Sequence, residues 1–242
     1  MRDVSAGPVH LERRSFENWS RMIRVDDVLT ATPKTEDEAL SIVQWAAGQG
    51  YRVRPVGSFL GWSPLAFVDA ANIIAIDQSQ MTGLTGFTYE PVPAATFRAG
   101  TTLAEAVKAL EEIDNRGESE APGWAWPDYP GIPAVTLGGM LAIGAHGAGI
   151  RQRDDQADLF GTVSNLVLGF RAIVSDGDCT SFGSFVGTSL MLRPCSSSWG
   201  LPTYCLSPCA WSPIALSAAR SNIQTGRLPT HPRRRKGAFK HS

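Results

Sequence analysis

The sequence predicts a domain that combines helices and strands, of the α+β or α/β class. The first observation behind this prediction is a strand-helix-strand opening, in which short apolar runs at residues 28–31 and 51–55 flank a helical pattern. The second is the return of strand-like apolar runs at residues 73–76, 96–99 and 163–174, with a second helical pattern before the last of them.

Both predicted helices begin at a capping box. Thr35 with Glu38, and Thr102 with Glu105, pair a hydroxyl that can accept from the amide three residues on with a carboxylate that can reach back. The first helix continues with an apolar stripe and stops at a pair of glycines, and the second runs to about Glu112.

The two ends of the chain carry weaker patterns. Residues 1–24 are polar and mixed, which predicts an irregular lead-in with Phe16 and Trp19 packed against the domain. Asp176-Gly177 is a strong hairpin signal, so residues 180–185 are expected to return beside the strand that ends there.

The composition changes sharply near Asp178. All 23 acidic residues precede residue 179, whereas residues 179–242 hold 8 basic residues, no acid and all four cysteines. Beyond Gly187 no apolar period is sustained, and prolines interrupt each candidate element. Residues 188–242 are therefore predicted to be a disordered or frame-shifted tail, with a genuine basic tail as the alternative.

Several classes of function lack their signatures. A net charge of −1 predicts no nucleic-acid partner, although Arg233 to Lys236 keep a basic-tail contact open as a rival. There is no CxxC pair or G-x-S-x-G elbow, so neither a metal site nor that hydrolase class is expected. No stretch predicts a signal peptide or membrane span, which favours the cytoplasm, or secretion if the start is incomplete.

A glycine and serine loop follows the strand at residues 51–55. The segment Arg54-Pro-Val-Gly-Ser-Phe-Leu-Gly-Trp-Ser-Pro64 offers exposed amides and a hydroxyl that can form a nest for phosphate oxygens. Arg52 or Arg54 is available to supply positive charge. The alternative is a plain surface loop, and the missing lysine excludes a Walker loop.

The stretch Thr136-Leu-Gly-Gly-Met-Leu-Ala-Ile-Gly-Ala-His-Gly-Ala-Gly149 places five glycines around one histidine. Such a density predicts either a wrapped ligand or a very tight packing contact. His146 is the reactive side chain here, or else a histidine satisfied by a backbone carbonyl. The aromatic loop at residues 117–133 could wall a pocket or cover the edge of the core.

Three segments together resemble the flavin-binding (PCMH-type) domain of the vanillyl-alcohol oxidase superfamily, closest to the covalent-flavin bacterial cholesterol oxidases, with sugar-lactone oxidases second. They are residues 53–66, residues 136–149 and the segment Gly161-Thr-Val-Ser-Asn-Leu-Val167. The resemblance implies an α+β domain at residues 16–187, after a lead-in at 1–15, with FAD between two α+β subdomains.

The resemblance also implies the residues that bind FAD. They are Pro55, Val56, Gly57, Ser58, Phe59, Leu60, Gly61, Trp62, Ser63, Thr136, Gly138, Gly139, Ile143, Gly144, His146, Gly147, Ser164, Asn165 and Val167. The first loop would hold the pyrophosphate and the other two the flavin end, with His146 joined covalently to the flavin. Leu60 stands where many lactone oxidases have a flavin-linking histidine, which removes that attachment.

The implied function is oxidation of a small-molecule alcohol, sterol-like or sugar-lactone-like, with oxygen as acceptor. The family's substrate domain has no counterpart in this sequence, so the catalytic base is not identified and the chain is expected to be the front part of an oxidase. The alternatives are an FAD-binding fragment or pseudo-enzyme without turnover, and a non-flavin α+β domain.

Overall fold

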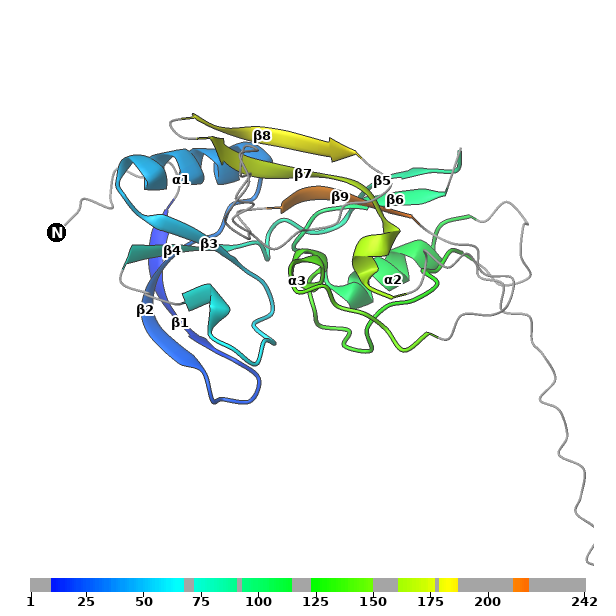
Figure 1. The fold of residues 1–242 in the computed structure, drawn as a ribbon, viewed down its shortest axis with the longest axis horizontal. Coiled ribbons are helices and arrows are strands. Elements are labelled where there is room, and N and C mark those ends of the chain that lie inside the picture. The colour runs from blue at the N-terminus through cyan, green and yellow to red at the C-terminus, as the bar shows by residue number, and fades with distance from the viewer. Residues whose placement is uncertain are drawn as a thin grey trace, which may run out of the picture.

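The computed structural model describes residues 10–67, 72–90, 93–114, 123–149, 161–176, 179–186 and 211–217. Two sheets make up the fold, the first at the left of Figure 1 and the second at its upper right. The first has the order β1 (Leu11–Glu17), β2 (Arg24–Ala31), β4 (Ile73–Asp77), β3 (Arg52–Val56). The second has the order β5 (Leu84–Thr88), β6 (Ala94–Phe97), β9 (Trp211–Ser217), β7 (Val167–Asp176), β8 (Cys179–Val186). The predicted α+β class is confirmed.

The first sheet is built around β4, which is covered on both faces. Its neighbours β2 and β3 run parallel to it and are joined through α1 (Glu36–Gly48). One face packs Ile74 and Ile76 against the buried stripe of α1, and the other packs Ala75 near Phe67 of η1 (Leu65–Phe67). A strand buried on both faces explains why residues 73–76 are continuously apolar rather than alternating.

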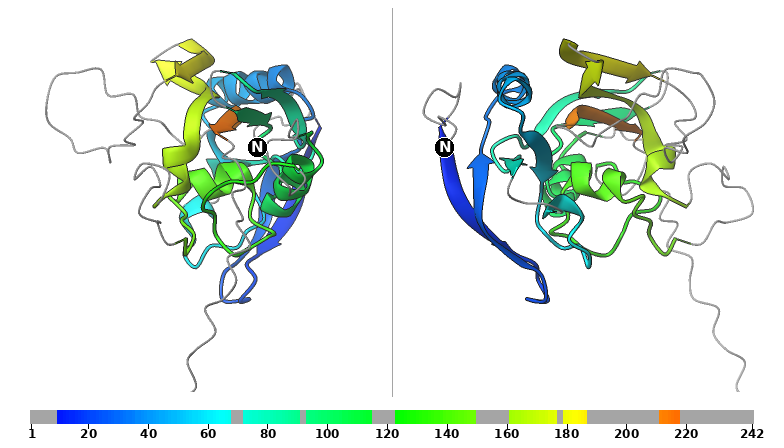
Figure 2. Two further views of the ribbon diagram at one scale, coloured as in Figure 1. Left: turned by 90° about the vertical axis from the view of Figure 1, so that its right-hand side faces the viewer. Right: turned by 60° about the vertical axis from the view of Figure 1, so that its left-hand side comes forward.

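The second sheet is antiparallel throughout, and its core lies on the side of α2 (Leu103–Glu111), α3 (Leu137–Ala142) and η4 (Val163–Leu166). Phe97 of β6 and Phe170 of β7 are buried against these helices. The two halves are joined where β7 passes α1: Arg171 pairs with Glu36 at 2.7 Å, and Ile173 is buried in the core of the first sheet. Figure 2 shows α1 beside the β7–β8 hairpin and the β1–β2 hairpin at the outer edge.

Both predicted helix starts are observed. The hydroxyl of Thr35 accepts from the Glu38 amide at 3.1 Å, but the Glu38 carboxylate accepts from the amide of Lys34, one residue earlier than a capping box requires. At Thr102 the box is complete, because Glu105 accepts from the Thr102 amide at 2.8 Å. Each cap satisfies amides that the first helical turn leaves unpaired.

The prediction of a strand over residues 163–174 is wrong for its first four residues. Residues 163–166 form the helix η4, and the strand starts at Val167 and continues to Asp176. Val163 and Leu166 are both buried, three residues apart, which a helical turn allows and an extended strand facing one core does not. The returning strand β8 is confirmed, since Asp176 pairs with Cys179.

The prediction that residues 1–24 form an irregular lead-in is also wrong, because Leu11–Glu17 forms β1, which pairs antiparallel with β2. The polar pattern of this strand reflects its place at the edge of the sheet, where most of its side chains are exposed. Phe16 packs against Phe59 and Phe67 as expected. Trp19, in contrast, is 56% exposed and meets Trp62 edge-on.

The expectation that residues 188–242 lack regular structure is wrong for residues 211–217. These form β9, which lies between β6 and β7 and supplies the pairing for both. Pro213, which weakened the strand signal, stands at a shift in the β7 register, so its missing N–H removes no regular ladder bond. The other residues of the predicted tail lie outside those that the structure describes.

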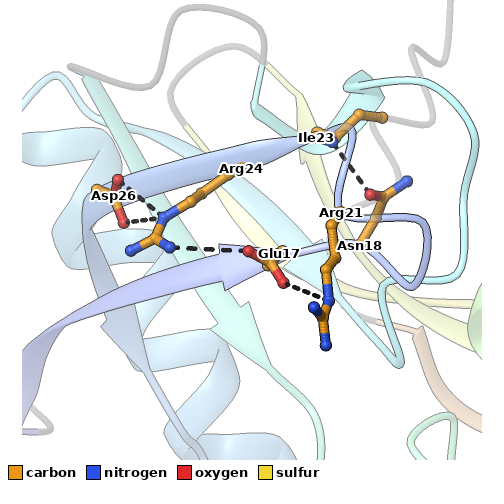
Figure 3. A network of polar contacts seen from close by, with 6 residues as sticks. All are labelled: Glu17, Asn18, Arg21, Ile23, Arg24 and Asp26. Atoms are coloured by element: carbon orange, nitrogen blue, oxygen red, sulfur yellow. Dashed lines mark hydrogen bonds and ion pairs between the residues drawn. The ribbon is translucent and has the colours of Figure 1, made fainter.

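The turn between β1 and β2 carries a polar network, drawn in Figure 3. Asn18 is buried and accepts from the Ile23 amide, while Arg24 pairs with Asp26 at 3.0 Å and with Glu17 at 3.7 Å. Hydrogen bonds from Ser15, and secondly from Arg24, hold the pKa of Asp26 below its ordinary value. Asn18 also donates from Nδ2 to the carbonyl oxygen of Gly61 at 3.0 Å, which ties the hairpin to the loop that follows β3.

Candidate functional site

A cleft of about 240 Å³ opens between the end of β3 and the start of α3. Its walls combine the two glycine loops that the sequence singled out. It is lined by Arg54, Pro55, Val56, Gly57, Ala66, Gln78, Thr136, Gly138, Gly139, Ala142 and Ile143. A volume somewhat below the roughly 300–1,000 Å³ of whole-ligand pockets suits one part of an extended ligand.

The two loops touch each other directly. The hydroxyl of Ser58 donates to the carbonyl oxygen of Ala134, and a methyl group built on Gly57 would overlap the side chain of Thr136. Glycine is therefore required at position 57 by this close approach. The two glycine loops therefore meet in the fold.

The loop after β3 presents its backbone outward. Phe59 has a φ of +50°, in the left-handed region that non-glycine residues seldom adopt. Among the described residues, the amides of positions 58–63 donate no hydrogen bond to another backbone group, whereas the carbonyl of Gly61 accepts from Asn18 at 3.0 Å. Amides left open beside a left-handed residue are the geometry of an anion-binding nest. Residues 58–63, all predicted to bind the cofactor, belong to this loop but not to the cleft wall, which the segment reaches through residues 54–57.

The first turn of α3 has a different role. Leu137 donates to Thr101 at 2.8 Å, Gly138 to Ala99 at 2.9 Å and Gly139 to the Thr136 hydroxyl at 3.2 Å, so these amides are already used. A Cβ on Gly138 would lie 3.1 Å from that of Ala99. Of the two explanations for the glycines, tight packing accounts for this pair.

His146 is exposed on the segment after α3 and is not part of the cleft wall. Its Nδ1 lies 2.9 Å from the carbonyl oxygen of Gly147. A carbonyl only accepts, so Nδ1 must be the donor, and in the neutral ring Nε2 then carries the lone pair. Gly144, with a φ of +61°, makes the turn that brings the chain from α3 to this histidine.

The third predicted segment lies beside His146. His146 pairs with Thr162 in an isolated bridge, and the amide of Val163 donates to Ala145 at 2.8 Å. Ser164 and Asn165 follow in η4, and Val167 opens β7. These three residues therefore lie on the His146 side of the site rather than in the cleft wall.

Asp128 is a residue that the sequence analysis missed. It is 8% exposed, and its Oδ1 accepts from the Gly149 amide at 2.9 Å. Side chains on Gly147 or Gly149 would overlap its carboxylate. Asp128 thus holds the segment that carries His146, and no local pattern signals this because 21 residues separate the donor and the acceptor.

The cleft wall also contains two unsatisfied donors. Within the described residues, Nε of Arg54 and Nε2 of Gln78 are buried without a hydrogen-bond partner. Arg54 was considered as a source of charge, but Gln78 was not. Buried polar atoms are almost always paired, so these two donors are open to an acceptor that the described residues do not supply.

The aromatic loop covers the core instead of walling the cleft, since Trp124 and Trp126 are 2% and 4% exposed. The described residues contain no group of three or more His, Cys, Asp or Glu side chains that could hold a metal ion. In the same part of the chain no helix is long and apolar enough to cross a membrane. Arg233 to Lys236 lie outside the described residues.

Two sheets with a cleft at the meeting point of two glycine loops define a cofactor-binding α+β domain. The sequence matches the FAD binding domain family over residues 29–183, and the chain belongs to this family. Its cofactor is FAD.

The solved structures that resemble the chain are led by cholesterol oxidases. A histidine-to-alanine mutant of the enzyme from Brevibacterium sterolicum is 25% identical with a TM-score of 0.71, over 88% of this chain and 38% of that chain. A solvent-stable cholesterol oxidase is 27% identical with a TM-score of 0.69, over 87% of this chain and 38% of that one. A probable L-gulonolactone oxidase of Arabidopsis thaliana is 29% identical over 49% of this chain and 18% of its own length. The chain therefore spans well under half of these relatives.

The residues present fit an FAD site. The outward amides after β3 and the cationic Arg54 suit the acceptor oxygens of a pyrophosphate. Gly57, Gly138 and Gly139 line the cleft, and Thr136 and Ala99 fill the positions that a Cβ of Gly57 or Gly138 would take, so these glycines let the walls of the cleft come together. His146 remains accessible on the neighbouring segment.

Proposed function

We propose that this chain forms the FAD-binding portion of a flavin-dependent oxidoreductase that oxidises a small-molecule alcohol, sterol-like or sugar-lactone-like, with oxygen as acceptor. The observation that carries the proposal is the cleft at which the loops of residues 57–63 and 136–147 meet. The substrate class is taken from the relatives, which are named as cholesterol and L-gulonolactone oxidases.

The residues would divide the cofactor between two ends. The amides of residues 58–63 would bind the pyrophosphate, with Pro55, Val56 and Gly57 forming one wall beside it and Thr136, Gly138, Gly139 and Ile143 the opposite wall. Gly144, His146, Gly147, Ser164, Asn165 and Val167 would surround the flavin end. Bound FAD supplies a hydride acceptor at flavin N5 and passes the two electrons to oxygen. The protein's own part is binding and orientation.

His146 is proposed to bond covalently to the flavin. The ring is exposed, its Nδ1 is engaged with Gly147, and the neighbouring Ala145 and Gly147 are too small to block a bulky group. A lone-pair imidazole nitrogen can attack an activated methyl carbon. The new C–N bond would replace one C–H bond of the methyl group: that proton and the imidazole N–H proton would pass to solvent, and the electron pair would be taken up by the flavin and then by oxygen.

The covalent link is tested by acid precipitation of the protein reconstituted with FAD. Yellow colour should remain in the pellet of the wild type and be lost in His146→Ala, while the same variant still binds FAD before precipitation. Colour that survives His146→Ala, or a colourless wild-type pellet, would refute the link.

The wider proposal is tested by the visible spectrum of the purified protein with FAD. A flavin spectrum that bleaches anaerobically on addition of an alcohol and returns with oxygen supports the oxidase function. A flavin spectrum that no sterol or sugar-lactone alcohol bleaches would instead favour an FAD-binding unit without turnover.

A further inference from the structure

Two side chains of the cleft wall each have a buried donor atom without a hydrogen-bond partner in the described part of the chain. Arg54 lies on β3, and Gln78 follows directly after β4. The strands are parallel neighbours: Arg54, in the middle of β3, lies opposite Ala75, and Gln78 follows Asp77 at the end of β4. Both line the cleft.

The burial of these groups makes their lack of partners costly. Gln78 is 5% exposed, and its Nε2 is buried without a hydrogen bond in the described part of the chain. Nε of Arg54 is in the same state. Leaving a buried donor unpaired destabilises a protein, so a sequence free of other demands would place apolar residues here.

The chemistry of the missing partner follows from the two atoms. Both are donors, so the partner must offer acceptor oxygens. Arg54 is the charged residue among the described residues that line the cleft, and no carboxylate lies there to neutralise it. An anionic group with acceptor oxygens, such as a phosphate, satisfies both conditions, because a guanidinium bonds such groups in a charge-assisted way.

We infer that Arg54 and Gln78 together bind the diphosphate of the cofactor, Arg54 through charge-assisted hydrogen bonds and Gln78 through its amide Nε2. This inference rests on FAD occupying the cleft, as proposed above. It adds two residues from the sheet to a site otherwise assigned to loop backbone. It also gives these residues opposite effects on two quantities: they strengthen binding, and they weaken the ligand-free fold.

The experiment measures both quantities in the full chain. Dissociation constants for FAD, ADP and riboflavin are determined by calorimetry, and melting temperatures are determined without ligand, for the wild type, Arg54→Met and Gln78→Leu. Arg52→Met and Gln49→Leu are the matched controls, since both residues are exposed and lie outside the cleft. Methionine and leucine retain most of the aliphatic volume.

Arg54→Met is expected to weaken FAD and ADP binding by about 10- to 100-fold, and Gln78→Leu by about 2- to 10-fold. Riboflavin, which has no phosphate, should bind equally to all variants. The ligand-free melting temperatures of both variants should equal or exceed that of the wild type, because an unpaired donor has been removed. The controls should stay within twofold of the wild type in every affinity.

Two results would overturn the inference while leaving the proposed function intact. One is wild-type FAD affinity in both variants. The other is a loss of FAD affinity accompanied by an equal loss for riboflavin and a lower melting temperature, which would assign the residues a structural role. A wild-type chain that binds neither FAD nor ADP would instead overturn the proposed function, and the inference with it.

Discussion

Asp128 allows a sharp test of how the segment carrying His146 is held. Its buried carboxylate accepts from the Gly149 amide at 2.9 Å, and a Cβ on Gly149 would lie 2.8 Å from the same oxygen. Asp128→Ala removes the acceptor and leaves the Gly149 amide without this partner, which should lower the free energy of unfolding by about 1.5–3 kcal/mol. Asp128→Asn retains an acceptor oxygen and should cost under about 1 kcal/mol.

The same structure predicts that Gly149→Ala acts on the same bond. The added methyl group must displace the carboxylate, so this variant should also lose about 1.5–3 kcal/mol. Because the double variant can lose the interaction only once, its cost should fall short of the sum of the single costs by about 1.5–3 kcal/mol. Urea unfolding followed by circular dichroism measures the free energy of unfolding of the wild type, Asp128→Ala, Gly149→Ala and the variant that carries both changes, provided that their m-values are equal. Additive losses, or an Asp128→Ala variant within about 0.5 kcal/mol of the wild type, would refute the reasoning.

Two further predictions concern the strands. Ala215→Pro removes a backbone donor in the middle of β9 and should lower the free energy of unfolding by about 1–3 kcal/mol. Pro213→Ala, at the register shift, should change the free energy of unfolding by under about 0.5 kcal/mol. Equal effects of the two variants in urea unfolding would contradict the central place of β9. Ser15→Ala should raise the pKa of Asp26 toward its ordinary value, because the main hydrogen bond that stabilises the carboxylate is lost. A lowered carboxyl pKa favours the fold above its unfolded-state pKa and ceases to do so as the pH falls through the folded-state value. NMR titration of this carboxyl checks the prediction, and an unchanged pKa would contradict it.

Local sequence signals predicted those parts of the fold that depend on neighbouring residues. Thr35 and Thr102 started helices because a cap acts within one turn, and residues 73–76 formed a buried strand because the run is apolar throughout. The strand β1 was missed because an edge strand carries few buried side chains, and η4 was taken for a strand because a short apolar run does not distinguish the two. β9 was missed because its pairing depends on β6 and β7 rather than on its own residues.

The sequence by itself determined the family of this protein, its FAD cofactor and the α+β class. The family and the cofactor follow from glycine-rich motifs that are each formed by neighbouring residues, and the class follows from the order of the apolar runs. Only the tertiary structure showed that the loops meet at Gly57 and Thr136, and that the glycines after Thr136 pack internally while those after β3 leave their amides open. It also brought Asp128 to Gly149 and placed Arg54 and Gln78 in one cleft. These relations depend on burial and on contacts between residues distant in the chain, which no local pattern encodes.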